Sequence, residues 1–210
     1  MPIITKLERQ KHDSKRVSVF VDEEYAFSLS DELVILHKLA VGKDVNLLPL
    51  KELAEEDDFS RALTACYELL GRSEKTEKQL REYLTKKTYS EETADRVTDR
   101  LKELGYLDDR AYAERFTENC RGLGKRAIRC KLSSRGVPQA IITEVLNALP
   151  DESLLEDACR LAEKQRARYA ALPEREQKRK ISEFLARRGY DWDTVSGAVE
   201  HLFSVEEDDL

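Results

Sequence analysis

The feature that most constrains the fold of this chain is a 22-residue pattern that occurs three times. The copies are Leu80–Leu101, Ile128–Leu149 and Ile181–Leu202, and they align without a gap. Apolar residues recur at matching places with the spacing of helices. Because an internal repeat determines an architecture before any single motif does, we expect three similar structural units.

Each copy is predicted to fold as a helix, a tight turn and a second helix. Gly136 and Gly189 lie where the first helix should end in a left-handed residue. Thr88 takes that place in the first copy, so its turn must either close differently or bear strain. Ser90 and Asp191 follow as N-caps of the second helix.

A further amphipathic helix precedes each pair. Apolar spacing predicts these helices over Phe59–Arg72, Arg110–Arg121 and Leu154–Tyr169. Thr76 and Gln79 have the spacing of a capping box at the start of the next helix in the first unit. The repeats therefore predict nine helices in three three-helix units.

The first 58 residues do not follow the repeat. Three runs rich in apolar, β-branched and aromatic residues predict strands at Ile3–Leu7, Val17–Val21 and Tyr25–Leu29. Asp22–Glu24 is predicted to be a hairpin turn, and Asp31–Leu39 and Leu50–Glu56 to be short helices. The acidic residues Glu55–Asp58 then form either a linker or the N-terminus of a helix.

The predicted fold class is mainly α. Three tandem three-helix repeats form a curved, solenoid-like array, preceded by a small β-rich (α+β) N-terminal module. The predicted domains are the β-rich module (residues 1–58), the repeats (59–108, 109–150 and 151–204) and an acidic tail (205–210).

The net charge of −6 is unevenly distributed. Residues 109–150 carry eight basic and four acidic residues, whereas residues 1–58 and 151–210 are each net acidic. The candidate binding residues of this basic segment are Arg121, Lys125, Arg126, Arg129, Lys131 and Arg135. They form either an ordinary solvated helix face or a surface that contacts phosphates or an acidic partner.

Composition argues against several classes of protein. The chain has no apolar run of the roughly 20 residues that span a membrane and no secretory signal, so we expect a cytoplasmic protein. Cys66, Cys120, Cys130 and Cys159 are scattered without metal-ligand spacing, and the apolar helical patterns around Cys66 and Cys159 favour small core residues. Since no catalytic motif occurs either, we expect no metal, no cofactor and no enzymatic activity.

Two short motifs have competing interpretations. Asp108 and Asp109 could bind a cation, act as acid and base or contact a partner, but adjacent acidic residues before a helix favour capping. Gly122, Gly124 and Lys125 resemble part of a phosphate loop, but the full motif and the preceding strand are lacking. An interhelical turn is the preferred interpretation there.

Three stretches resemble the RecX family. They are RSEKTEKQLREYLTKK (Arg72–Lys87), LGYLDDRAYAERF (Leu104–Phe116) and GKRAIRCKLSSRGV (Gly124–Val137), and the N-terminal RVSVFVDEEYAFSLSDELV is similar to that of longer family members. The chain departs from the family at Thr88, where glycine is usual, and at Lys78–Gln79, where a glutamate is common. Both departures concern local helix ends.

This resemblance implies tandem three-helix repeats and a regulator of the RecA recombinase. The expected protein binds RecA or its filament on DNA and inhibits filament assembly, ATP hydrolysis and strand exchange. Arg72, Asp108 and Asp109 join the candidate contact residues on this basis. The alternative is an autonomous nucleic-acid-binding protein that contacts single- or double-stranded DNA and affects recombination indirectly. We expect a monomer in either case.

Overall fold

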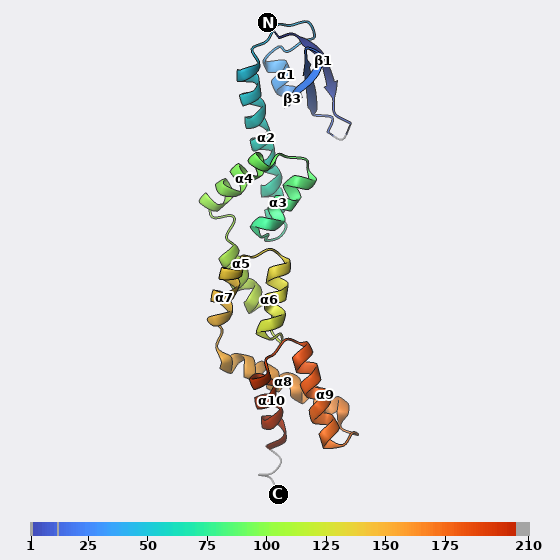
Figure 1. Ribbon diagram of the computed structural model, residues 1–210, viewed down its shortest axis with the longest axis vertical. Helices are drawn as coiled ribbons and strands as arrows, with labels where there is room; N and C mark the ends of the chain where they lie inside the picture. The colour runs from blue at the N-terminus through green and yellow to red at the C-terminus, as the bar shows by residue number, and fades with distance from the viewer. Residues whose placement is uncertain (1, 12, 205–210) are drawn as a thin grey trace. The chain divides into compact units, whose positions relative to one another are not determined.

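The computed structural model describes residues 2–11 and 13–204, so the acidic tail expected at 205–210 lies outside the described residues. Figure 1 shows a small sheet near the N-terminus followed by helices. The chain divides into two compact units. Unit 1 comprises Met1–Glu74 and Leu80–Tyr106, and unit 2 comprises Lys75–Gln79 and Leu107–Leu210.

The sheet of unit 1 has three antiparallel strands in sequence order: β1 (Ile4–Arg9), β2 (Arg16–Val21) and β3 (Glu24–Ser30). Asp22 and Glu23 connect β2 to β3 with φ angles of 50° and 72°. Two successive positive φ angles are typical of the turn whose twist matches a hairpin. The predicted strands and hairpin are confirmed, and the predicted short helix follows as α1 (Asp31–Leu36).

The next helix, α2 (Leu47–Leu70), continues where the sequence predicted a break. Both predictions for Glu55–Asp58, a linker and a helix N-terminus, are therefore wrong, because these residues lie in the interior of the helix. They hold α2 against the sheet: Asp58 pairs with Arg16, and Asp57 accepts a hydrogen bond from the Ser30 N–H at 2.8 Å. Ala54 of α2 packs in the same apolar core as the sheet residues.

The remaining helices have the predicted order. Unit 1 continues with most of α3 (Glu77–Lys86) and with α4 (Glu91–Glu103). Unit 2 contains α5 (Asp109–Glu118), α6 (Lys125–Ser134), α7 (Gln139–Asn147), α8 (Asp151–Tyr169), α9 (Glu174–Arg187) and α10 (Trp192–Ser204). Over the described residues, α2–α10 are the nine predicted helices and α1 is a tenth. The mainly helical fold with three three-helix repeats and a small sheet is confirmed.

The first helix of each repeated pair ends in the same way. Thr88, Gly136 and Gly189 have φ angles of 63°, 85° and 89°. In each case the residue after them donates its N–H to a carbonyl five residues back: Tyr89 to Leu84, Val137 to Leu132 and Tyr190 to Leu185. These bonds define a Schellman motif, with an apolar residue at both ends of the bond. The Thr88 turn therefore closes like the others, at the cost of a β-branched residue in the left-handed region.

Helices of unit 2 meet end to end. At the start of α6, the N–H groups of Gly124 and Arg126 donate to the carbonyls of Arg188 and Gly189 at the end of α9, at 3.0 and 3.2 Å. A Cβ atom on Gly124 would lie 2.2 Å from the Gly189 backbone. Glycine is thus needed at position 124 for the close approach, and at position 189 for the approach and the positive φ.

The same arrangement joins the first turn of α3, which belongs to unit 2, to the end of α6. The Thr76 hydroxyl donates to the Arg135 carbonyl at 2.6 Å. A Cβ atom on Gly136 would lie 2.2 Å from the Lys78 side chain. Thr76 also forms the predicted capping box, because its backbone N–H donates to the Gln79 side chain at 3.1 Å and its hydroxyl accepts from the Gln79 N–H at 3.3 Å.

Replacing Gly189 with alanine should destabilise unit 2 more than the same change at Gly122. Both have positive φ, which costs an alanine about 1–2 kcal/mol. A Cβ on Gly189 would also lie 2.4 Å from the Ala127 nitrogen, whereas a Cβ on Gly122 would meet Leu161 at an ordinary 3.5 Å. Urea unfolding of G189A and G122A measures the difference. Equal losses of stability would contradict the importance of the close approach.

Asp191 should make stability depend on acidity. Its carboxylate caps α10 by accepting the Thr194 N–H at 2.9 Å, and hydrogen bonds from Thr194 hold the Asp191 pKa below its usual value. The stabilisation of the folded state by the ionised Asp191 cap is therefore fully present above the unfolded pKa of about 3.9. It is lost as the pH falls through the folded pKa. We expect D191A to lose about 1 kcal/mol near neutrality and less near pH 3.

Unfolding of wild type, D191A and D191N at both pH values tests this expectation. The asparagine variant keeps a capping oxygen without a titrating group, so it should track the wild type more closely near neutrality. A deficit of D191A that is the same at both pH values would contradict it.

Candidate partner-binding surface

Four of the six predicted basic residues are exposed on unit 2, and three of these, all but Arg126, make no side-chain hydrogen bond or ion pair among the described residues. Arg121, Arg129 and Lys131 are exposed, and none forms an ion pair within the part of the chain that the structure describes. Arg121 precedes α6, and the other two extend from it. Because Ile128 and Leu132 face the core, Arg129 and Lys131 lie on opposite flanks of the buried stripe. The exposed charges of α6 therefore lie on both sides of its buried face.

The other three predicted basic residues make contacts inside unit 2. Lys125 pairs with Asp151 at 2.7 Å. Arg126 donates from its guanidinium to the Ala186 carbonyl at 2.8 Å. The Arg135 guanidinium lies 4.3 Å from the centre of the Phe116 ring. Half of the predicted surface thus contributes to the packing of this unit.

Asp108 and Asp109 both cap helices. Asp108 accepts the N–H groups of Arg110 and Ala111 at 2.9 and 3.0 Å, which confirms it as the N-cap of α5. Asp109 is half-buried and accepts the Glu77 N–H at the start of α3 at 2.9 Å. Each carboxylate thus satisfies backbone donors that have no partner within their own helix.

The phosphate-loop interpretation of Gly122–Lys125 is wrong. The N–H of Gly122 donates to Asp157 at 3.1 Å, and those of Gly124 and Arg126 donate to the end of α9. The backbone donors that a phosphate would need are already occupied. The segment is the predicted interhelical turn.

Arg72 is exposed just after α2 and belongs to unit 1, whereas all the other predicted contact residues belong to unit 2. The basic surface of unit 2 is therefore defined without it.

Three of the four cysteines and Tyr190 are at least partly buried, whereas Cys130 is exposed. Cys66 is fully buried, and burial raises the pKa of its thiol to about 11. Burial also raises the thiol pKa of Cys120 and Cys159, so these groups are protonated near neutrality. Tyr190 is 4% exposed, and burial raises the pKa of its hydroxyl to about 12. Cys66 therefore lies in the core as expected, and Tyr190 belongs to the apolar core of unit 2.

Sequence reasoning missed a second cationic region, in unit 1. Its basic residues come from the end of β1, the loop before β2, the middle of α2 and the end of α3. Net charge over residues 1–58 concealed it, because most acidic residues of that segment lie elsewhere. The local clusters Lys11–Arg16 and Lys86–Lys87 are the signal that could have found it.

The β-rich module and three three-helix units define a class of tandem-repeat proteins, and comparison with known proteins identifies the family. The model of the regulatory protein RecX N-terminal domain matches residues 2–46. The models of the first, second and third RecX three-helix domains match residues 62–101, 108–146 and 151–199. The chain belongs to the RecX family of regulatory proteins.

Individual relatives agree over nearly the whole length. Regulatory protein RecX of Clostridium botulinum (strain Eklund 17B / Type B) is 36% identical over 211 residues, covering 98% of this chain and 99% of the relative. A crystal structure of regulatory protein RecX has the same fold, with a TM-score of 0.67 and 24% identity over 98% of this chain and all of that one. RecX from Lactobacillus salivarius gives a TM-score of 0.68 at 25% identity, covering 70% of this chain and 97% of that one.

Among the described residues, no helix is both long enough and apolar enough to cross a lipid bilayer.

Arg126 and Arg129 should differ in their effect on stability. R126Q removes the hydrogen bond to the Ala186 carbonyl and should cost about 1 kcal/mol. R129Q changes an exposed side chain and should stay within about 0.5 kcal/mol of the wild type. Chemical unfolding of the two variants measures this difference. The reverse ranking would show that the Arg126 contact does not stabilise unit 2.

Proposed function

We propose that this protein is a cytoplasmic, non-enzymatic regulator that binds RecA on DNA and inhibits filament assembly, ATP hydrolysis and strand exchange. The observation that carries the proposal is the match of four RecX family models in order along the chain. Inhibition requires only that the protein compete with RecA–RecA or RecA–DNA contacts, so no catalytic group is needed.

The basic surface of unit 2 is the proposed contact region. Arg121, Arg129 and Lys131 are exposed cations bordering α6, within a segment that is net basic in an acidic chain. Such charges attract an acidic protein surface or phosphates and speed association with them. Lys125 and Arg126 support the helix that carries Arg129 and Lys131.

The test is the single-strand-dependent ATPase activity of RecA, with this protein titrated from far below to equal to the RecA concentration. We expect inhibition at substoichiometric amounts, because blocking growth of one filament affects many subunits. R129E/K131E should need at least about tenfold more protein, since it reverses two contact charges. K164E/R168E is the matched control and should act as the wild type does, because it reverses two exposed charges on α8.

If both double variants lost the same amount of inhibition, the charges of α6 would not be the contact surface. No effect of the wild type at equimolar RecA, together with direct binding to DNA, would favour the autonomous nucleic-acid-binding alternative.

A further inference from the structure

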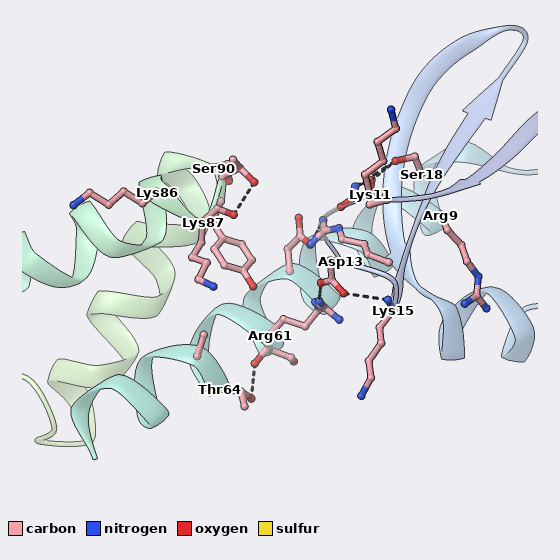
Figure 2. Close-up of a pocket in the computed structure, with 18 of the residues that line it drawn as sticks. Arg9, Lys11, Asp13, Lys15, Ser18, Arg61, Thr64, Lys86, Lys87 and Ser90 are labelled. Atoms are coloured by element: carbon pink, nitrogen blue, oxygen red, sulfur yellow. Dashed lines mark hydrogen bonds and ion pairs between the residues drawn. The ribbon is translucent and has the colours of Figure 1, made fainter. Parts of the chain in front are cut away.

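A groove of about 1270 Å³ lies within unit 1, between the sheet and the turn that joins α3 to α4. Figure 2 shows Lys87 and Ser90 on one side, Lys11 and Asp13 on the other, and Arg61 and Thr64 of α2 between them. The Lys87 side chain extends toward α2, whereas Lys86 points away. Three parts of the chain that are distant in sequence thus surround one hollow.

The lining of the groove is cationic. Among the described residues, seven basic and four acidic ones line it, although the whole chain has a net charge of −6. Three of the acidic residues are paired: Glu8 with Lys6, Asp13 with Arg61 and Asp58 with Arg16. Lys11, Lys15, Lys86 and Lys87 are exposed and form no ion pair among the described residues. The uncompensated charge of the groove is therefore positive.

The repeat explains why this space is open. In unit 2, the ends of α6 and α9 approach the start of another helix so closely that positions 136 and 189 must be glycine. The equivalent end of α3 carries Thr88, which is exposed and lines the groove. Thr88 is exposed, so its Cβ has room at this position, whereas a Cβ at either glycine would meet Lys78 or Ala127.

We propose that this groove binds the sugar-phosphate backbone of single-stranded nucleic acid. Separate lysines on opposite walls suit a chain of phosphates better than a single anion, and a hollow admits one strand more readily than a duplex. Tyr25, 59% exposed, and the half-buried Tyr89 also line the groove, so aromatic rings lie beside the cations. Cations interleaved with aromatic rings are the combination that binds single strands without sequence preference.

This inference goes beyond the proposed function, because it concerns unit 1 and requires no RecA. The protein would then bind directly to the single strand on which the filament forms. Failure of either proposal leaves the other standing: the ATPase assay tests unit 2 charges, whereas the groove is tested with nucleic acid alone.

The experiment is fluorescence anisotropy of a labelled oligothymidylate of about 20 nucleotides, titrated with the full-length protein at several salt concentrations. The groove variant is K15Q/K87Q, one lysine from each wall. We expect its affinity to fall at least about tenfold near 0.1 M salt. The slope of log affinity against log salt should become shallower by about 0.7 for each lysine removed.

K38Q/K51Q is the matched control. It removes two exposed lysines of the same unit that do not line the groove, so the total charge changes equally. We expect nearly wild-type binding, and circular dichroism should show that all three proteins are folded. The proposal would be overturned by any of three results. These are an equal loss of affinity in both variants, wild-type affinity in K15Q/K87Q, and no binding by the wild type. Inorganic polyphosphate that competes as well as unlabelled oligothymidylate of equal charge would overturn the assignment to nucleic acid.

Discussion

Hydrogen bonding between the ends of different helices is the interaction on which unit 2 depends. The first N–H groups and last carbonyls of a helix have no partners within it. Here the start of α6 supplies donors to the end of α9, through Gly124 and Arg126, and Thr76 supplies a hydroxyl to the end of α6. Each joint satisfies groups that would otherwise need water or a ligand. The close approach then excludes any side chain at Gly124, Gly136 and Gly189.

These joints also decide which charges are available to a partner. The Arg126 guanidinium is bonded to the Ala186 carbonyl of α9, and Lys125 is paired with Asp151. Arg129 and Lys131, on the same helix, remain exposed. A basic segment that looks uniform in sequence is therefore divided between residues that hold the unit together and residues that can meet an acidic or phosphate-bearing surface. Stability measurements and RecA assays should separate the two groups.

Thr88 links the repeat to the groove of unit 1. Its positive φ shows that the helix end keeps the closure of the other repeats, at an energetic cost that glycine would avoid. The equivalent glycines of unit 2 meet another helix start, whereas Thr88 borders an open, lysine-lined space. A departure from the repeat that the sequence could only mark as a strained or altered turn thus coincides with a candidate binding site.

The sequence by itself determined the features that depend on neighbouring residues. Apolar periodicity determined the nine repeat helices, the polar residues Asp22–Glu24 between two strand-like runs determined the hairpin, and the Asp108 cap and the Thr76 capping box followed from short spacings. Family motifs such as LGYLDDRAYAERF were likewise readable, because they are contiguous.

Only the tertiary structure decided the features that depend on residues far apart. Asp58 and Asp57, inside the continuous helix α2, contact Arg16 and Ser30 of the sheet, which lie far away in the sequence. The engagement of Arg126 depends on Ala186, 60 residues away. The cationic groove joins Lys15 to Lys87 across the fold, and its charge vanished in a sum over residues 1–58. Local residue spacing does not predict such contacts, because they form only when folding brings distant helix ends and strands together.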